Sequence, residues 1–345
     1  MASATNETGS HTRAHRAATA ALITGCWSTQ VIHAAVGLGL PDRLASGAAG
    51  SAELAALAGT PPRAMFRLLR ALVVLGLCSQ DADDRFSLTE AGEYLRTDVP
   101  ESLAVLALHW GGRTWPALGQ LEASVKSGEP WKLGGREGFF SMAHRPRDAQ
   151  VLNRSMADQT LLVAQAIVDA YDFSAFRMVI DLGGGYGALL SVLLKAYPQL
   201  RGACADLAYM ESDARAFLEV AGVGERAGFI PTDFFKSVQA GADGYLLKFI
   251  IHDWDDADAV EILRNTAQAA GREGVVLLVE QIVPERVAAV DSLVIRGDIH
   301  MMAATGGMER TESEYRELLS RAGLQLTRIV PSASQFSLME ARTTR

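Results

Sequence analysis

At residues 178–187 the chain reads Met178-Val179-Ile180-Asp181-Leu182-Gly183-Gly184-Gly185-Tyr186-Gly187. A largely apolar run of this kind is typical of a parallel strand that is buried on both faces. The glycines that follow allow a tight turn and let a ligand approach the backbone without meeting a Cβ atom. A helical pattern at 188–197 comes next, and the N–H groups at its start favour an anion. The sequence therefore predicts a strand, a ligand-binding turn and a helix in succession.

The same order of strand and helix repeats through the second half of the chain. Apolar runs stand at 244–249 and 275–280, and helical patterns stand at 212–221, 257–270 and 311–322. This alternation predicts an open α/β sheet with right-handed crossovers, whose ligands bind at the carboxyl ends of the strands. Asp206 ends the next strand-like stretch, residues 203–206. Its separation from Asp181 in the sequence is about that of a carboxylate that binds ribose hydroxyls. The alternative is that Asp206 only caps the next helix.

The first half of the chain is helical in pattern. Residues 14–37 are amphipathic, Ser51 is a candidate N-cap, and Pro61 and Pro62 open a further helix. A turn and a short strand at 85–88 follow, and this order is typical of a winged helix. The predicted division is a disordered tail at 1–12, a winged-helix domain at 13–100, a helical connecting region at 101–172, and the α/β domain at 173–345.

Composition excludes several classes of protein. The chain has 345 residues, of which 49% are hydrophobic and 21% charged, so it can bury a large core. A net charge of −8 argues against a protein that holds nucleic acid or an anionic membrane by charge. Three scattered cysteines suit neither a disulfide framework nor a zinc site, and they favour the reducing cytoplasm. Residues 17–27 superficially resemble a signal peptide but lack a clean cleavage signal, and we expect no membrane span.

Several motifs accompany the glycine turn in a fixed order. Asp-x-Gly-x-Gly-x-Gly at 181–187 resembles motif I of S-adenosylmethionine-dependent methyltransferases. More specific stretches are Thr232-Asp233-Phe234-Phe235, Lys248-Phe249-Ile250-Ile251-His252-Asp253-Trp254 and Gly306-Gly307-Met308-Glu309-Arg310-Thr311. Over nearly its whole length the chain resembles the plant caffeate-type and bacterial antibiotic-type small-molecule O-methyltransferases. The resemblance implies a Rossmann-like class I methyltransferase sheet of seven strands with a final antiparallel hairpin. It also implies a mainly helical N-terminal winged-helix domain through which the protein forms a homodimer.

The resemblance also assigns residues to S-adenosylmethionine, which leaves as S-adenosylhomocysteine. The glycine turn would hold the methionine end, Asp206 the ribose hydroxyls, and Asp233 with Phe234 the adenine. The expected cofactor-binding residues are Asp181, Gly183, Gly185, Asp206, Leu207, Asp233, Phe234 and Lys248. The chain departs from the family in having Ala208 where proline is usual and Thr232 where glycine is usual. Both departures leave the carboxylates in place, so they concern loop geometry more than cofactor identity.

The chemistry of methyl transfer asks for an oriented acceptor that loses its proton. A phenol has a pKa near 10 and an ordinary histidine near 6.5, so complete proton transfer before attack would cost roughly 5 kcal/mol. Concerted transfer, or a carboxylate that makes the histidine more basic, lowers this cost. His252 follows a buried strand at the edge where ligands bind and matches the family's catalytic base. Glu280 and Glu309 match the two carboxylates that flank it, and Glu309 is expected to orient the imidazole.

Both assignments have simpler alternatives. His252 and Asp253 could cap the helix that begins near Asp255, and Glu280 could face solvent at a strand end. The family also implies that the connecting region at 101–172 forms part of the acceptor pocket. It suggests pocket walls from Phe140, Met156, Met301 and Met302, with Asp253 close by. Methionine favours contact with aromatic rings, although core packing is the alternative for each of these side chains. No metal is implied.

The main hypothesis is methyl transfer from S-adenosylmethionine to a hydroxyl of a small aromatic or heteroaromatic acceptor in secondary metabolism. One alternative is an N-methyltransferase, and another is an enzyme that uses the cofactor without transferring its methyl group. A third, from another class, is a winged-helix regulator that senses a ligand, because Arg63, Arg67 and Arg70 share one helix face. The acidic net charge argues against this regulator and against any nucleic-acid partner.

Overall fold

The computed structural model describes residues 2–99, 101–131 and 134–344, without the side chains of residues 2–12, 113, 147, 148 and 151. The chain divides into two compact units, Met1–Trp115 and Pro116–Arg345. The finer predicted division, with a connecting region at 101–172, stays a prediction.

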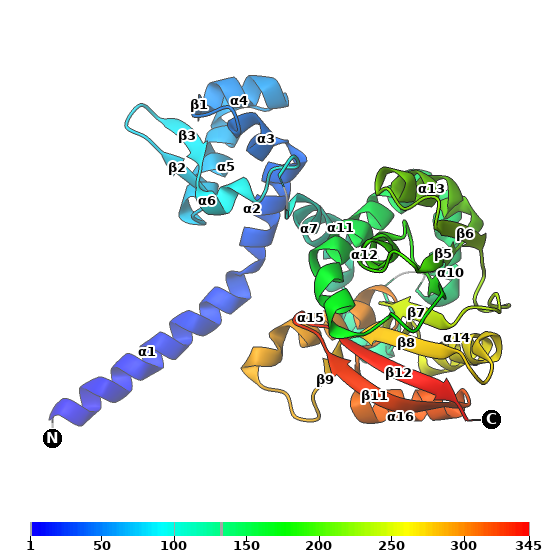
Figure 1. Ribbon diagram of the computed structural model, residues 1–345. Coiled ribbons are helices and arrows are strands. Elements are labelled where there is room, and N and C mark those ends of the chain that lie inside the picture. Colours follow the sequence, from blue (N-terminus) through cyan, green and yellow to red (C-terminus); the bar gives the residue numbers. More distant parts are fainter. Residues whose placement is uncertain (1, 100, 132–133, 345) are drawn as a thin grey trace. The chain divides into compact units, whose positions relative to one another are not determined.

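The first unit is mainly helical (Figure 1). Its helices are α1 (Ala2–Thr24), α2 (Cys26–Gly37), α3 (Leu40–Leu44), α4 (Ser51–Ala58), α5 (Pro62–Val74), α6 (Glu90–Glu93) and α7 (Ala104–Leu108), followed by the π-helical turn η1 (His109–Arg113). Its described strands β1 (Ala49–Gly50), β2 (Cys78–Gln80) and β3 (Arg85–Leu88) form an antiparallel sheet in the order β1-β3-β2. Apolar residues of α4, α5 and β3, such as Leu54, Leu69 and Phe86, share one buried core. This arrangement is the winged helix that the sequence predicts.

Two features at the N-terminus differ from the predictions. The helix expected at 14–37 is divided between α1 and α2 at Gly25. The Thr24 hydroxyl donates to the Ala20 carbonyl at 2.9 Å, and such bonds, like glycine itself, disfavour a continuous helix. In addition, α1 begins at Ala2, within the stretch predicted to be a disordered tail. A helix that has formed adds further residues at little cost, which accounts for the extension.

Helix α8 (Trp115–Leu118) starts at the last residue of the first unit. The second unit continues with α9 (Leu121–Ser127), α10 (Gly135–Ser141), η2 (Met142–His144) and the long α11 (Pro146–Ala170). Strands and helices then alternate: β4 (Met178–Leu182), α12 (Ala188–Ala196), β5 (Arg201–Asp206), η3 (Ala208–Met210), α13 (Glu211–Val220), β6 (Ala227–Pro231), β7 (Gly244–Lys248), η4 (Ile251–Asp253), α14 (Asp256–Ala270) and β8 (Val275–Glu280). The chain ends with β9 (Ile282–Val283), η5 (Ala289–Asp291), α15 (Ser292–Ala304), β10 (Arg310–Thr311), α16 (Glu312–Arg321), β11 (Leu324–Pro331) and β12 (Ser337–Thr343).

Seven of the described strands form one mixed sheet in the order β11-β12-β8-β7-β4-β5-β6. Strands β8, β7, β4, β5 and β6 are parallel, whereas β12 runs antiparallel to both β8 and β11. This confirms the predicted class I methyltransferase topology with its antiparallel final hairpin.

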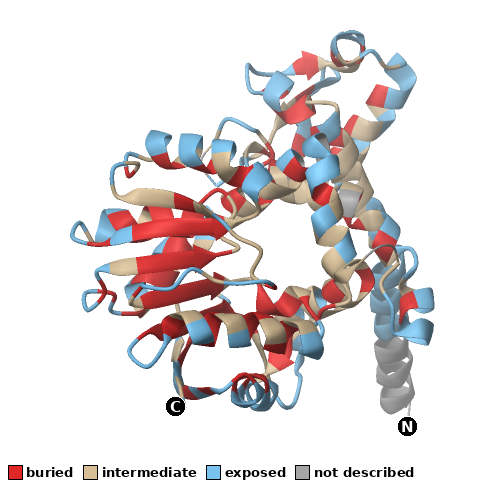
Figure 2. Ribbon diagram, turned by 90° about the vertical axis from the view of Figure 1, so that its right-hand side faces the viewer, coloured by how far each residue is buried: buried red, intermediate tan, exposed pale blue. Residues whose placement is uncertain are grey.

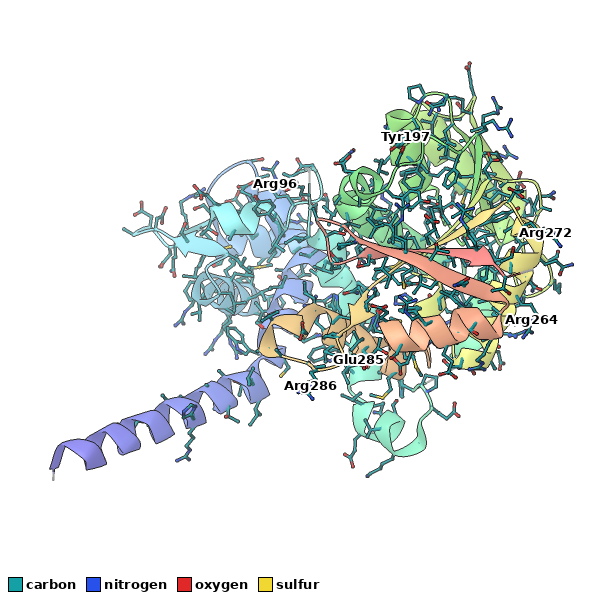
Figure 3. The ribbon with its side chains drawn as sticks, turned by 60° about the horizontal axis from the view of Figure 1, so that its bottom comes forward. Arg96, Tyr197, Arg264, Arg272, Glu285 and Arg286 are labelled. Carbon is teal, nitrogen blue, oxygen red and sulfur yellow. The ribbon has the colours of Figure 1, made fainter. Side chains whose placement is uncertain are left out.

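The central strands are buried on both faces, and Figure 2 shows them as a red layer between helices. Alternate residues point to opposite faces, so Val179 packs with α11, α12 and α13, whereas Ile180 packs with α14 and α16. Arg264 of α14, and Arg272 just after this helix, are exposed on the outside of the unit (Figure 3).

The parallel strands all end at one edge of the sheet. Asp206 is the last residue of β5, Lys248 of β7 and Glu280 of β8. Within the part of the chain that the structure describes, no helix has the length and apolar character that crossing a membrane requires.

Candidate active site

The turn between β4 and α12 is built from glycines that the backbone requires. Gly183, Gly185 and Gly187 have φ angles of 67°, 59° and 80°, which other residues rarely adopt. A Cβ atom on Gly183 would lie 2.3 Å from Ile250 Cδ1, so this position is also sterically closed. A Cβ atom on Gly185 would instead meet no described atom within 4 Å. The turn therefore leaves open space beside its backbone at Gly185, as a bound ligand requires.

Asp206 joins this turn to the end of β5. Its Oδ2 accepts a hydrogen bond from the Gly185 N–H at 2.9 Å, and Oδ1 accepts one from the Leu207 N–H at 2.7 Å. Burial raises the pKa of Asp206, and these two N–H donors oppose that rise. Asp206 thus does more than cap a helix, because it binds the glycine turn directly.

Asp181 lies beneath the turn and is almost completely buried. A Cβ atom on Gly184 would lie 2.6 Å from Asp181 Oδ2. Burial raises the pKa of Asp181 to about 7, although the positive charge of Lys248 opposes the rise. Direct contact between Asp181 and a cofactor stays a prediction.

Asp233 and Phe234 follow β6, at the other expected end of the cofactor site. Asp233 accepts a hydrogen bond from the Phe235 N–H at 3.2 Å and forms an ion pair with Lys236 at 2.9 Å. It lines a cavity of about 340 Å³ at this end of the strand. The Phe234 ring packs against Phe235 and Trp254, with centroids 5.2 and 6.0 Å away.

Lys248 ends β7, which lies between β4 and β8 in the sheet. Its ammonium group donates to Thr160 Oγ1 on α11 at 2.9 Å and lies 4.8 Å from the centre of the Phe249 ring. Burial lowers the pKa of Lys248 to about 8, against the opposing charges of Glu280 and Asp181.

His252 lies on the 3₁₀ turn η4, directly after the strand β7. Its side chain is buried, and its Nδ1 atom is 2.8 Å from Glu309 Oε1. Its Nε2 atom is 3.8 Å from Asp253 Oδ1. Burial alone would lower the pKa of His252, but Asp253, Glu309 and Glu280 together outweigh it and raise the pKa to about 9. The surrounding carboxylates therefore make this imidazole a stronger base than an ordinary histidine.

The capping alternative for His252 is wrong. The N-cap of α14 is Asp255, whose side chain accepts a hydrogen bond from the Asp258 N–H at 2.9 Å. His252 instead directs its Nδ1 atom toward Glu309, which lies 57 residues further along the chain.

Glu280 does not face solvent, so that alternative is also wrong. It is fully buried, and its Oε1 atom accepts hydrogen bonds from the Ile250 and Ile251 N–H groups at 3.0 and 2.8 Å. Its Oε2 atom is buried and has no hydrogen-bond partner among the described residues. Burial raises the pKa of Glu280 to about 7, against the opposing effects of His252 and the two backbone donors. Atoms of His252, Glu280 and Glu309 lie within 4.8 Å of one another, which brings the three predicted catalytic residues together.

The predicted acceptor residues are spread over three elements. Phe140 lies on α10 with 36% of its surface exposed and packs against Phe235, while Met156 is partly buried on α11. On α15, Met301 is buried and Met302 partly buried. The Met301 sulfur lies 3.7 Å from the Thr305 hydroxyl. Asp253 stays beside the His252 ring, and burial raises its pKa to about 6.

The segment between β9 and α15 carries exposed charges, and Figure 3 shows Glu285 and Arg286 on it. Glu285 accepts a hydrogen bond from the Ser313 hydroxyl on α16 at 2.8 Å.

Sequence reasoning missed three residues that the structure places against His252. The Phe249 ring stacks on the imidazole, Arg310 binds the turn η4, and Gly307 lets the backbone approach that turn. Gly307 and Arg310 flank Glu309 in one motif, and this proximity was an available signal. No sequence signal indicated the left-handed backbone of Phe249, because phenylalanine rarely adopts this conformation.

Comparisons with known proteins agree with this geometry. Residues 119–325 match the O-methyltransferase domain family, and residues 20–98 match the O-methyltransferase dimerisation domain family. The chain belongs to the S-adenosylmethionine-dependent O-methyltransferases. It is 37% identical to the phenazine O-methyltransferase PhzM of Lysobacter antibioticus, covering 93% of this chain and 94% of that protein.

Further relatives extend the comparison. The O-demethylpuromycin-O-methyltransferase of Streptomyces alboniger is 38% identical, over 93% of this chain and 87% of the relative. The 8-amino-8-demethylriboflavin N,N-dimethyltransferase of Streptomyces davaonensis is 31% identical over 91% of each chain. A crystal structure of NcsB1, an O-methyltransferase from neocarzinostatin biosynthesis, superposes with a TM-score of 0.81 at 33% identity, covering 92% of this chain and 96% of NcsB1. That structure contains S-adenosylmethionine and 2-hydroxy-5-methyl naphthoic acid.

Proposed function

We propose that this enzyme transfers the methyl group of S-adenosylmethionine to a hydroxyl of a small aromatic or heteroaromatic acceptor, with His252 as general base. The observation that carries the proposal is the buried hydrogen bond of 2.8 Å between His252 Nδ1 and Glu309 Oε1. In the neutral imidazole, Nδ1 carries the proton and directs it to Glu309. Nε2 is then the atom that takes the proton from the hydroxyl to be methylated. The acceptor class is inferred from the relatives, whose names describe small aromatic natural products.

The raised basicity of His252 supports this role. Asp253, Glu309 and Glu280 raise the pKa of His252 toward that of a phenol, so its unprotonated imidazole takes a phenolic proton at a smaller cost than an ordinary histidine would. The imidazolium that forms has Glu309 at 2.8 Å and Asp253 at 3.8 Å to balance its charge. A positioned base of this kind typically contributes about 10²–10⁴-fold to the rate.

The residues around the glycine turn fit S-adenosylmethionine, which supplies the electrophilic methyl group when it is bound. Gly183 and Gly185 would receive its methionine end, because open space lies beside Gly185. Asp206 would accept hydrogen bonds from the ribose hydroxyls, with Leu207 beside it, while Asp233 and Phe234 would contact the adenine. Lys248 would add a positive charge between the cofactor turn and His252.

The acceptor would bind among Phe140, Met156, Met301 and Met302, with Asp253 next to the reacting hydroxyl. Asp253 Oδ1 is 3.8 Å from His252 Nε2, the atom assigned to accept the proton. Adaptable methionines and an aromatic ring suit a flat apolar ligand.

Mass spectrometry of the wild type and His252→Gln tests the proposal. The enzyme is incubated with S-adenosylmethionine and a panel of phenols, hydroxyphenazines, flavonoids and hydroxyquinones. A methylated product that the wild type forms and His252→Gln forms in much smaller amount supports base-assisted O-methylation. Equal amounts of product from both proteins with a phenol of pKa near 10 contradict the role of His252.

N-methylation is the second candidate, because the riboflavin relative is an N,N-dimethyltransferase. A nitrogen acceptor has a lone pair already available, so His252→Gln would then reduce the rate little. Amino and hydroxyl analogues of one aromatic ring separate the two reactions directly. Product formation from either analogue also excludes chemistry that leaves the methyl group on the cofactor.

We further propose a cytoplasmic homodimer joined through the first unit. The match to a dimerisation domain at 20–98 supports the dimer, as do Leu22 and Ile23 of α1, which are 83% and 74% exposed. An exchange of residues 14–37 between subunits would complete the partner's pocket, and a fully active monomer in light scattering would contradict it. Three free thiols, Cys26, Cys78 and Cys204, support a reducing compartment, and cell fractionation checks this location.

A further inference from the structure

The turn that carries His252, η4, is a 3₁₀ helix of only three residues. Within η4 and its flanks, the Asp253 N–H donates to the Ile250 carbonyl at 3.2 Å and the Trp254 N–H donates to the Ile251 carbonyl at 3.3 Å. A single 3₁₀ turn has poor hydrogen-bond geometry. The direction of the imidazole therefore depends on the groups that bind this turn from other parts of the second unit.

Glu280 binds the N–H groups at the start of the turn. Its Oε1 atom accepts from both Ile250 and Ile251, so one carboxylate oxygen joins the end of β8 to the residues just before His252.

Arg310 binds the carbonyl groups on both sides of His252. Its Nη1 atom donates to the Ile251 carbonyl at 3.0 Å, and its Nη2 atom donates to the Trp254 carbonyl at 2.9 Å. The Nε and Nη2 atoms also bind Asp256 Oδ1 at 3.2 and 2.8 Å. The whole guanidinium group is buried, whereas 52% of the Asp256 side chain is exposed. A planar group with two diverging donors can bridge two carbonyls in a way that a lysine cannot.

The backbone beside Arg310 lies directly against the same turn. The Met308 N–H donates to the His252 carbonyl at 2.9 Å. A Cβ atom on Gly307 would lie 2.0 Å from this carbonyl oxygen, so only glycine allows the approach. Glu309 and Arg310 therefore reach His252 and its turn from one short segment.

We propose that Arg310 is a positioning residue for methyl transfer, which fixes the turn η4 so that His252 Nε2 faces the acceptor hydroxyl. This inference rests on the proposed role of His252 as general base. A buried arginine is expensive to desolvate and adds little to stability by itself. Its use at this point is explained by the fixed direction that it gives to His252.

The test uses Arg310→Lys and Arg310→Met, with Arg321→Met as the matched control. Arg321 binds the other oxygen of Asp256 at 3.6 Å and is 44% exposed, so its loss disturbs the same carboxylate. Arg310→Lys keeps the charge but not the bridge between two carbonyls. The values of kcat and KM are measured across pH with a phenol that the wild type methylates, and S-adenosylhomocysteine affinity is measured by calorimetry.

Both Arg310 variants are expected to lower kcat about 10²-fold at neutral pH, since a misplaced catalytic group costs about this much. Their KM and S-adenosylhomocysteine affinity should change by less than about threefold, because Arg310 contacts neither ligand site. The loss should shrink as the pH rises above the acceptor's own pKa, because an ionised acceptor needs no base. Arg321→Met should stay within about twofold of the wild type, as is usual for surface substitutions.

Three results would overturn the inference. These are a neutral-pH kcat within about twofold of wild type in Arg310→Lys, a loss of kcat that is equal at every pH, and a loss that Arg321→Met reproduces. If Arg310→Met fails to fold, Arg310→Lys decides the question. His252→Gln in the same series separates the two proposals. Wild-type kcat in His252→Gln rejects the base itself, whereas a collapse there without any loss in Arg310→Lys rejects only the role of Arg310.

Discussion

The ring of Phe249 lies flat against the imidazole of His252, with centroids 4.2 Å apart and planes inclined by 4°. Phe249 has a φ of 55°, which a bulky residue rarely adopts, and this bend turns the chain from β7 directly into η4. The Phe336 ring meets Phe249 edge-on at 4.5 Å. The stack thus limits rotation of the imidazole, while Glu309 holds its Nδ1 atom.

Replacing Phe249 by leucine is expected to lower kcat about 3- to 10-fold, because a stacked aromatic pair is worth about 0.5–1.5 kcal/mol beyond its buried area. Leucine keeps an apolar side chain but cannot restrain the imidazole through a flat face. Phe249→Tyr keeps the ring and serves as the control. Steady-state kinetics give the comparison, and equal rates in the leucine and tyrosine variants would reject a role for the stack.

Activity is expected to rise with pH up to about 9. The base must be unprotonated to accept a proton, and the carboxylates around His252 raise its pKa to about 9. Stability has the opposite sign, since a histidine whose pKa is raised on folding stabilises the native state below pH 6.5 and loses this contribution as the pH rises through about 9.

Glu309→Gln tests the cause of that profile. Loss of the negative charge 2.8 Å from Nδ1 should move the midpoint of the kcat profile to lower pH. Glu285→Gln, an exposed carboxylate elsewhere in the second unit, should leave the midpoint in place. A midpoint that stays near 9 in Glu309→Gln would show that another group controls the rate.

Asp206→Asn is expected to weaken S-adenosylhomocysteine binding by about 10- to 100-fold, since a hydrogen bond to a charged group is worth about 1.5–3 kcal/mol. Both carboxylate oxygens accept backbone N–H groups, and an amide would place an N–H₂ group against one of these donors. Isothermal titration calorimetry measures the affinity. Glu211→Gln, on the nearby helix α13, is the control, and unchanged affinity in Asp206→Asn would remove this residue from the cofactor site.

Chelation is expected to leave activity unchanged. Atoms of His252, Glu280 and Glu309 are close enough to hold an ion, and the Oε2 atoms of both glutamates have no hydrogen-bond partner among the described residues. The hydrogen bond between His252 Nδ1 and Glu309 Oε1, however, already pairs the imidazole with a carboxylate without an ion. The rate is measured after dialysis against EDTA and again after addition of Mg²⁺ or Zn²⁺. A loss of activity that a metal restores would contradict this prediction.

Tyr171→Phe is expected to lower the free energy of unfolding by about 1–3 kcal/mol, because Glu340 would lose a buried hydrogen bond. The Tyr171 hydroxyl donates to Glu340 Oε2 at 2.8 Å, and Arg328 binds the same oxygen at 2.8 Å. Burial would raise the pKa of Glu340, but its hydrogen bonds with Tyr171, Arg328 and Thr327 outweigh burial and lower the pKa.

The pH dependence of that loss identifies its cause. A carboxylate whose pKa is lowered on folding stabilises the protein above its unfolded pKa near 4.5, and this contribution disappears as the pH falls through the lower native value. Urea unfolding at pH 7 and at acidic pH should therefore show a smaller effect of Tyr171→Phe in acid. Tyr94→Phe, on a half-exposed tyrosine, is the control.

Much of the fold could be predicted because local patterns carry it. Apolar runs, glycines and helical periodicity specify the order of strands and helices, and parallel strands must end at one edge of a sheet. Asp206, His252 and Glu280 follow strands in the sequence, so their approach to one edge was predictable. The approach of Glu309 to His252 was predictable only through the family motif that contains Glu309, because the two residues are 57 positions apart in the sequence.

The sequence by itself thus determined the sheet and the glycine turn, and it singled out His252, Glu280 and Glu309 as candidates. Only the tertiary structure decided how the His252 imidazole is held. Glu280 and Arg310 bind the Ile251 backbone across 29 and 59 residues of sequence. Backbone N–H and carbonyl groups are the same in every residue, so the sequence does not mark which of them a distant side chain will bind. The left-handed Phe249 is likewise imposed by surrounding packing, because its residue type disfavours that conformation.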